Sequence, residues 1–167
     1  MALTLRQTKG SPLTISEMDA NFTYAADGGY TYTEVEVSSA QILAMGSTPI
    51  ELLPAPGANS YYLTDNVILE YTHNTTAYTM AATDYVVVSG AQQMSAEKTI
   101  LTSTNNVQTV MKSSDGIDSV NDVNFSWVEG FNIPLELYGW DGSNPTLGDG
   151  TLLVKIWYKE KTFGTEL

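Results

Sequence analysis

Hydrophobic and polar residues alternate with a period of two along much of the chain after residue 29. In residues 30–37, YTYTEVEV, aromatic or aliphatic side chains alternate with Thr and Glu, the pattern of a half-buried strand. Segment 38–45 is predicted either as one helical turn capped by Ser38 or as the entry to a strand. Further strands are predicted at 48–53, 60–63, 66–71, 84–88, 98–101, 124–128, 135–138 and 152–158.

Turn-forming residues separate these segments. The turn motifs are His73-Asn74, Ser113–Gly116, Asp141–Pro145 and Gly148–Gly150. Gly, Pro, Asn, Asp and Ser favour the backbone conformations of turns. Short strands rich in β-branched and aromatic residues at this spacing predict an all-β fold, an antiparallel β-sandwich or jelly-roll-like domain. We place this domain at residues 30–161 and a C-terminal tail at 162–167.

Residues 1–29 follow a different pattern and are predicted to form an N-terminal attachment segment. Thr14 and Glu17 have the spacing of a capping box at the start of a helix. The apolar positions that follow the helical period, with one just before it, are Leu13, Ile15, Met18 and Phe22. We predict a short helix at about 15–24. A helix of about ten residues is marginal alone, so its apolar side must pack on its own domain or on another protein.

The charge of the chain is strongly negative and unevenly distributed. Seven Lys and Arg residues stand against 19 Asp and Glu, for a net charge of −12. No Lys or Arg lies between Gly10 and Glu97, and three of the seven cluster at Lys155, Lys159 and Lys161. Such a chain cannot neutralise many phosphates, which excludes nucleic acid as a main partner and argues against anionic membranes.

The residue types of common catalytic and metal sites are scarce. The chain has no Cys and one His, His73, which excludes thiolate chemistry and a multi-histidine zinc site. The acids in DGIDSVND, residues 115–122, lack the alternate spacing of a calcium loop. No nucleophile elbow or phosphate-binding loop occurs. We therefore expect a protein that is not an enzyme and has no cofactor and no metal.

Aromatic residues are the candidates for ligand binding or a subunit interface. They are Tyr61, Tyr62, Trp140 and Trp157. Their ring faces suit stacking on sugars, although strand aromatics also pack in cores and interfaces. In the last predicted strand, Lys155, Trp157 and Lys159 share one face. That face could meet solvent, or acidic residues on a neighbouring strand or subunit.

Two stretches carry a resemblance to a known class of proteins. Residues 9–14 are KGSPLT and residues 17–23 are EMDANFT. This pattern resembles the leader at the start of many fibre and other virion proteins of tailed bacteriophages. A second stretch, from Ser39 through Thr48–Gly57 to Gly148–Leu152, is similar to a small β-rich module of phage structural proteins. Many fibres with this leader are far longer, so one module favours a small decoration protein or a short fibre.

The resemblance implies a non-enzymatic virion structural protein, a capsid decoration or cement protein or a short head fibre. Its N-terminal segment would dock on the major capsid protein or another virion protein. The expected docking residues are Arg6, Lys9, Leu13, Ile15, Met18 and Phe22. A homo-oligomer, often a trimer, is also implied. The alternative is a tail or neck fibre whose β domain binds a host-surface glycan, and a glycan depolymerase is a distant third. Because the N-terminus lacks the apolar run of a signal peptide, we expect synthesis in the host cytoplasm and a final location in the virion.

Overall fold

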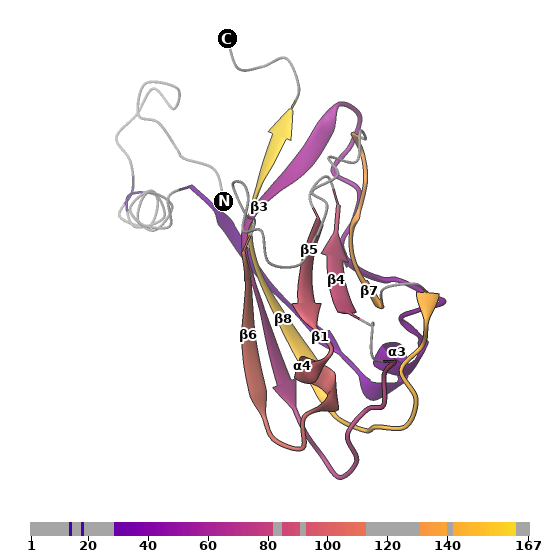
Figure 1. Cartoon of the computed structure of the whole chain (residues 1–167). Coiled ribbons are helices and arrows are strands. Elements are labelled where there is room, and N and C mark those ends of the chain that lie inside the picture. Colours follow the sequence, from indigo (N-terminus) through magenta and orange to yellow (C-terminus); the bar gives the residue numbers. More distant parts are fainter. Residues whose placement is uncertain are drawn as a thin grey trace, which may run out of the picture.

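The computed structural model of the chain contains two four-stranded sheets (Figure 1). It describes residues 14, 18, 29–81, 85–90, 93–112, 131–139 and 142–162. Sheet A has the order β1 (Thr31–Val37), β8 (Thr151–Thr162), β3 (Ser60–Thr72), β6 (Val107–Lys112). Sheet B has the order β2 (Ile50–Leu53), β7 (Leu135–Gly139), β4 (Tyr85–Ser89), β5 (Gln93–Glu97). All neighbouring strands are antiparallel, which confirms the predicted antiparallel β class.

The two sheets share one hydrophobic core. Alternate residues of β8, Leu152, Val154 and Ile156, are at most 2% exposed and belong to the same buried cluster as Val86 of β4 and Leu137 of β7. The alternation seen in the sequence therefore separates a core-facing side of each strand from an outer side. Burial of each such side chain stabilises the fold by roughly 1.5–3 kcal/mol, so this shared cluster holds the sheets against each other.

Helix α3 (Ser39–Ala44) follows β1 directly. Ser38 is its N-cap: the Ser38 N–H donates to Gln41 Oε1 at 3.0 Å, and the Gln41 N–H donates to Ser38 Oγ at 3.4 Å. This reciprocal capping satisfies two backbone donors at the start of the helix. It decides between the two predictions for segment 38–45 in favour of the helical turn, which buries Ile42 completely.

The prediction of a strand at 98–101 is wrong. Residues Thr99–Thr102 form the short helix α4. Its neighbouring residues Ile100 and Leu101 are both buried, at 1% and 0% exposure. Consecutive residues of a strand point to opposite faces, whereas one helical turn at the end of the core can bury both.

The sequence pattern predicts neither the continuity of β3 nor the presence of β5 and β6, and β8 extends beyond its predicted end at 158 to Thr162. The segments 60–63 and 66–71 belong to one long strand, β3, in which the pairing with β8 shifts register between Thr64 and Asn66. Such a shift marks a β-bulge. Strands β5 and β6 are not predicted by the hydrophobic pattern, because Gln, Ser, Ala, Glu and Lys dilute their alternation.

The predicted N-terminal helix and the predicted strand at 124–128 lie outside the described residues, and the helix stays a prediction. Within residues 1–28, Thr14 and Met18 are described, and the Met18 N–H donates to the Thr14 carbonyl at 3.0 Å. Among the described helices, none is long and apolar enough to span a membrane.

Candidate functional site

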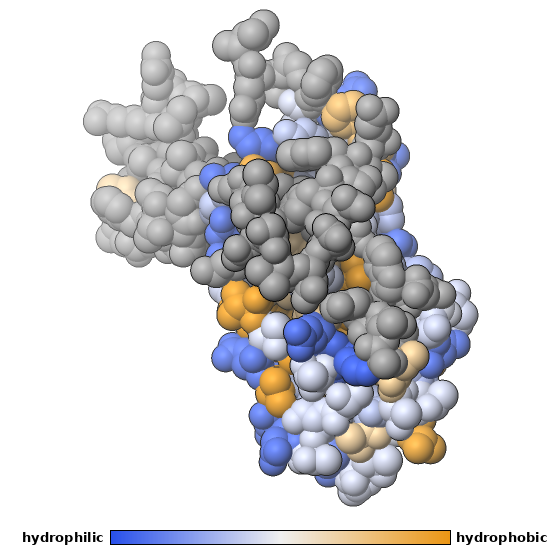
Figure 2. Space-filling view, viewed as in Figure 1, coloured by the Kyte–Doolittle hydropathy of each residue, from blue (hydrophilic) through white to orange (hydrophobic). Residues whose placement is uncertain are grey.

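Alternate residues of sheet A point away from the core and form a broad surface, which we call the outer face. The strand registers arrange its central part in three rows. They are Tyr32–Trp157–Asn66, Glu34–Lys155–Ile68–Val110 and Glu36–Leu153–Glu70–Gln108. Each row crosses the strands and mixes charged, polar and apolar side chains. Hydrophilic and hydrophobic residues are likewise interspersed on the described surface seen in Figure 2.

An aromatic pair lies in the first of the three rows. Tyr32 of β1 and Trp157 of β8 are directly opposite in register, with ring centroids 4.7 Å apart and an interplanar angle of 42°. Tyr32 is 44% exposed. Its hydroxyl donates a hydrogen bond to Glu34 Oε1, and this bond to a carboxylate is the main cause that raises the pKa of Tyr32 to about 12. The pair is therefore an uncharged aromatic surface at neutral pH.

A second aromatic contact continues along the same edge. The Lys159 ammonium lies 4.1 Å from the centroid of the Tyr30 ring, a cation–π distance. This contact holds the side chain of Lys159, one of the seven Lys and Arg residues of the chain, beside the Tyr32–Trp157 pair.

An ion pair occupies the centre of the outer face. Lys155 Nζ lies 2.7 Å from Glu70 Oε1, and Gln108 Nε2 donates to the same oxygen at 3.0 Å. The Lys155 and Glu70 side chains are 23% and 33% exposed. Lys155 therefore contacts an acidic residue on a neighbouring strand, Glu70 of β3. This is one of the alternatives predicted for this face from the sequence. The centre of the face presents paired charges instead of a bare cation.

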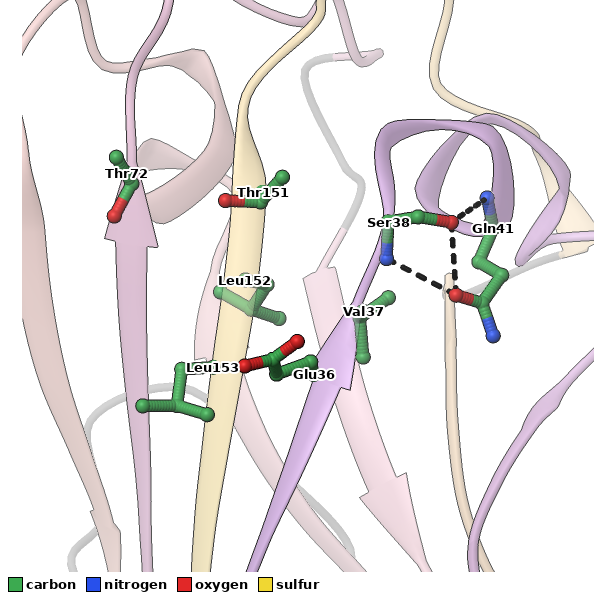
Figure 3. Close-up of a pocket in the computed structure, with 8 residues that line it drawn as sticks. All are labelled: Glu36, Val37, Ser38, Gln41, Thr72, Thr151, Leu152 and Leu153. Carbon is green, nitrogen blue, oxygen red and sulfur yellow. Dashed lines mark hydrogen bonds between the residues drawn. The ribbon is translucent and has the colours of Figure 1, made fainter.

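A groove opens beside the third row of the outer face, between the ends of β1, β8 and β3 and the start of α3 (Figure 3). Its volume is about 470 Å³. Its lining residues are Glu36, Val37, Ser38, Gln41, Thr72, Thr151, Leu152 and Leu153. Glu36 and Leu153 also belong to the outer face, so the groove and the face are continuous. The capping bonds between Ser38 and Gln41 fix one wall of the groove.

A hydrogen-bonded loop cluster surrounds Asp149, in the turn that precedes β8. The Asp149 carboxylate accepts bonds from the N–H groups of Thr75 and Thr76, from the Thr75 hydroxyl and from the Asn74 amide. These bonds, led by that of the Thr75 hydroxyl, lower the pKa of Asp149 to about 2. A carboxylate so stabilised is a poor general base. The cluster therefore connects two loops and does not supply an acid–base catalyst.

The four aromatic residues singled out from the sequence do not gather at one place. Tyr61 and Tyr62 are consecutive in β3 and point to opposite faces. Tyr62 is 7% exposed and donates its hydroxyl proton to the Pro54 carbonyl at 2.8 Å, so it is part of the core. The Tyr61 ring lies 6.2 Å from that of Phe131. Trp140 lies outside the described residues.

Trp157 is the one of the four whose aromatic partner lies directly opposite it on a neighbouring strand of the outer face and is exposed. That partner, Tyr32, is not among the predicted site residues. The alternation of residues 30–37 contains the necessary signal, because it puts Tyr32 on the same side of a strand as Glu34 and Glu36. That Tyr32 lies opposite Trp157 is not visible in the sequence, because it depends on the pairing of β1 with β8 in the sheet.

The predicted docking residues of the N-terminal segment remain a prediction. Met18 is described and is 40% exposed. The others lie outside the described residues: Arg6, Lys9, Leu13, Ile15 and Phe22.

Within the part of the chain that the structure describes, no group of three or more His, Cys, Asp or Glu side chains could hold a metal ion. Comparison with protein-family models, curated proteins and solved structures finds no match for the chain.

Proposed function

We propose that the chain is a non-enzymatic structural protein of a bacteriophage virion, a capsid decoration protein or a short head fibre. The observation that carries the proposal is the leader-like pattern of residues 9–23, followed by an antiparallel β domain. In this arrangement the N-terminal segment attaches to the major capsid protein or another virion protein. The β domain then projects from the particle or bridges neighbouring subunits.

We further propose that the two sheets form a jelly-roll sandwich. The pairing supports this assignment, because β1 pairs with β8, β2 with β7, β3 with β6 and β4 with β5. This is the pairing of one long hairpin, and the additional pairs β3·β8 and β4·β7 roll it into two sheets. Jelly rolls recur in viral capsid proteins and in lectins. One fold serves many functions. The jelly-roll pairing is therefore consistent with the virion assignment, but the leader-like pattern remains the observation that carries it.

The charge distribution is consistent with assembly in many copies. The net charge of −12 gives copies of the protein a mutual repulsion that keeps them soluble before assembly. Arg6 and Lys9 place positive charge in the segment proposed to dock. On the virion we expect a homo-oligomer, with a trimer as the state that the phage resemblance implies.

The experiment is a particle-binding assay with purified virions that lack this protein. Deletion of residues 1–24 should leave a soluble β domain that no longer joins particles. In the full chain, Ile15→Asp with Phe22→Asp should also abolish attachment, because both changes place charge on the apolar side of the predicted helix. The matched control, Ser16→Asp with Thr23→Asp, adds the same charge on the other side and should still attach. Full attachment of the truncated chain would refute the docking role of the leader.

The location on the particle follows from the copy number. Quantitative mass spectrometry of purified virions should find the protein at the abundance of a capsid-wide decoration if it coats the head. A copy number per particle that matches the symmetry of the neck or tail would favour the fibre alternative.

Recognition of a host-surface glycan is the second candidate function. The exposed Tyr32–Trp157 pair favours it, since exposed aromatic faces suit the C–H faces of sugar rings. The glycan depolymerase stays the third candidate, and loss of polysaccharide viscosity on incubation with the protein would support it.

A further inference from the structure

We propose that the outer face of sheet A binds a neutral oligosaccharide along a path from the groove at Glu36 to the Tyr32–Trp157 pair. The inference deepens the second candidate function and rests on that candidate alone. It does not depend on which part of the particle carries the protein.

The aromatic end of the path provides a stacking surface. Tyr32 remains 44% exposed although its ring contacts Trp157, so a large part of the residue is accessible to a ligand. The bond from its hydroxyl to Glu34 restrains the ring. A rigid aromatic surface loses little conformational entropy on binding. Sugar C–H groups can pack on this surface while their hydroxyls remain in water.

The groove end provides groups that hydrogen-bond sugar hydroxyls. Figure 3 shows the Glu36 carboxylate beside Leu153, and the Thr72 and Thr151 hydroxyls at the ends of neighbouring strands. Gln41 accepts bonds from Ser38 through its amide oxygen, which orients the amide and leaves its NH₂ group as a donor. Carboxylate, hydroxyl and amide groups together can both accept from and donate to hydroxyls.

The length of the path indicates an oligosaccharide. Glu36 and Tyr32 lie on the same side of β1, four residues apart. At about 3.4 Å per residue of an antiparallel strand, they are separated by about 14 Å. This distance exceeds the width of a single sugar ring, so one ligand that contacts both ends must contain several rings. Between the ends it would cross Leu153 and the Lys155–Glu70 pair.

The charges favour a neutral ligand. Three carboxylates, Glu34, Glu36 and Glu70, lie along the path and outnumber its two ammonium groups, Lys155 and Lys159. Lys155 is paired with Glu70 at 2.7 Å. Together with the net charge of −12, these carboxylates repel an acidic polysaccharide. A protein partner is a poorer fit, because the cores of protein interfaces are depleted of Lys and Glu, which occupy the centre of this face.

The experiment is a binding measurement on the full chain with two panels of probes. The neutral panel contains tetrasaccharides of maltose, cellulose, chitin and mannan type, and the acidic panel contains sialyllactose, alginate and oligogalacturonate. Isothermal titration should detect at least one neutral tetrasaccharide and none of the acidic probes. Binding of acidic probes alone, or of no probe in either panel, overturns the proposal.

Variants locate the site. Tyr32→Ala removes the stacking surface, and Glu36→Gln removes the charge of a hydrogen-bond acceptor, so each variant should weaken binding about tenfold. The controls are Leu147→Ala, at a side chain 68% exposed, and Glu97→Gln on β5 of the other sheet, which should bind as the unchanged chain does. Undiminished binding by Tyr32→Ala and Glu36→Gln, or equal losses in the controls, overturns the proposal.

A spectroscopic readout keeps the test independent of variant stability. The chain has three Trp residues, so an NMR spectrum of the indole N–H groups has few signals, and that of Trp157 can be assigned with Trp157→Phe. Addition of the neutral tetrasaccharide that binds should shift this signal. A Trp157 signal that stays in place while the tetrasaccharide binds overturns the proposal. A protein that joins particles but binds no glycan refutes this inference and leaves the proposed virion role intact.

Discussion

The carboxylate of Asp149 holds Thr75 by two hydrogen bonds, from its backbone N–H at 2.9 Å and from its hydroxyl at 2.5 Å. The two residues are 74 positions apart in the sequence. Asp149 lies in the turn before β8, and Thr75 in the loop after β3. With the Thr76 N–H at 2.8 Å, these bonds join two loops at the same end of sheet A. The end of the sheet beside the groove is thereby fixed by one acidic side chain.

The Asp149 cluster predicts a loss of stability at low pH. The folded-state pKa of Asp149 is lowered from 3.8 to about 2, so its contribution is present above the unfolded pKa and is lost as the pH falls towards about 2. The Tm of the protein should therefore fall between about pH 4 and pH 2. Asp149→Asn should lower Tm by several degrees at neutral pH and flatten this acid fall. Thermal unfolding followed by circular dichroism across the pH range measures both effects.

Asp65→Asn is the matched control for the acid experiment. Asp65 is exposed and accepts a bond from the neighbouring Asn66 side chain at 2.7 Å. Its replacement should leave the acid dependence of Tm close to that of the unchanged chain. Equal acid slopes for Asp149→Asn and the unchanged chain would contradict the assignment of the pH effect to Asp149.

Gly148 and Gly57 provide a comparison of backbone strain with steric clash. Both have positive φ, +86° and +113°, which costs a non-glycine residue about 1–3 kcal/mol. A Cβ at Gly148 would lie 2.4 Å from the Tyr78 ring, whereas at Gly57 no described atom lies within 4 Å. Gly148→Ala should therefore lower the free energy of unfolding more than Gly57→Ala, by about 1–3 kcal/mol for the additional overpacking.

Urea denaturation of the two glycine variants measures this difference. The comparison is internal, because both variants make the same chemical change at positive φ. If Gly57→Ala is as destabilising as Gly148→Ala, the contact between Gly148 and Tyr78 does not determine the packing of the loop before β8.

The ion pair on the outer face should contribute modestly to stability. Lys155 and Glu70 are partly exposed, at 23% and 33% of their side-chain surface, so solvent screens their attraction. A double-mutant cycle with Lys155→Met and Glu70→Gln should give a coupling free energy of about 0.5–1 kcal/mol. The coupling should decrease in high salt. A coupling indistinguishable from zero at low salt would show that the 2.7 Å contact does not stabilise the sheet in solution.

Local signals account for the parts of the fold that the sequence predicts correctly. The alternation in 30–37 identifies β1, and the Ser38–Gln41 spacing provides the cap of α3. Helix α4 is not predicted, because a short apolar run such as Ile100 and Leu101 fits a strand as well as a helix. The end of the core, where both side chains are buried, decides for the helix. Strands β5 and β6 escape because their polar residues weaken the alternation and pairing with neighbours defines them.

The candidate site is less predictable than the fold for a physical reason. Tyr32 and Trp157 are adjacent because β1 and β8 pair, although 125 residues separate them in the chain. Glu36 and Thr72 both line the groove because β1 and β3 pair with opposite sides of β8. The composition identifies aromatic residues as candidates, but only the register decides that Tyr62 is buried and that Trp157 lies beside an exposed tyrosine.

Two buried tyrosines allow a direct measurement of one hydrogen bond. Tyr78 is 2% exposed and donates its hydroxyl proton to the Gly150 carbonyl at 2.7 Å. Tyr71 is 1% exposed, its ring lies 6.2 Å from that of Tyr78, and its hydroxyl has no partner among the described residues. Tyr78→Phe should lower the free energy of unfolding by about 1–2 kcal/mol, because it removes the bond and leaves a buried carbonyl without its donor.

Tyr71→Phe makes the same chemical change but should not lower the free energy of unfolding. Removal of a buried hydroxyl without a partner relieves its desolvation penalty, so the variant should be as stable as the unchanged chain or more stable. Urea denaturation of the two variants under identical conditions checks the order. A loss in Tyr71→Phe equal to that in Tyr78→Phe would mean that a bound water satisfies the Tyr71 hydroxyl in solution. The packing beside Gly150 would then depend on that water as much as on the Tyr78 bond.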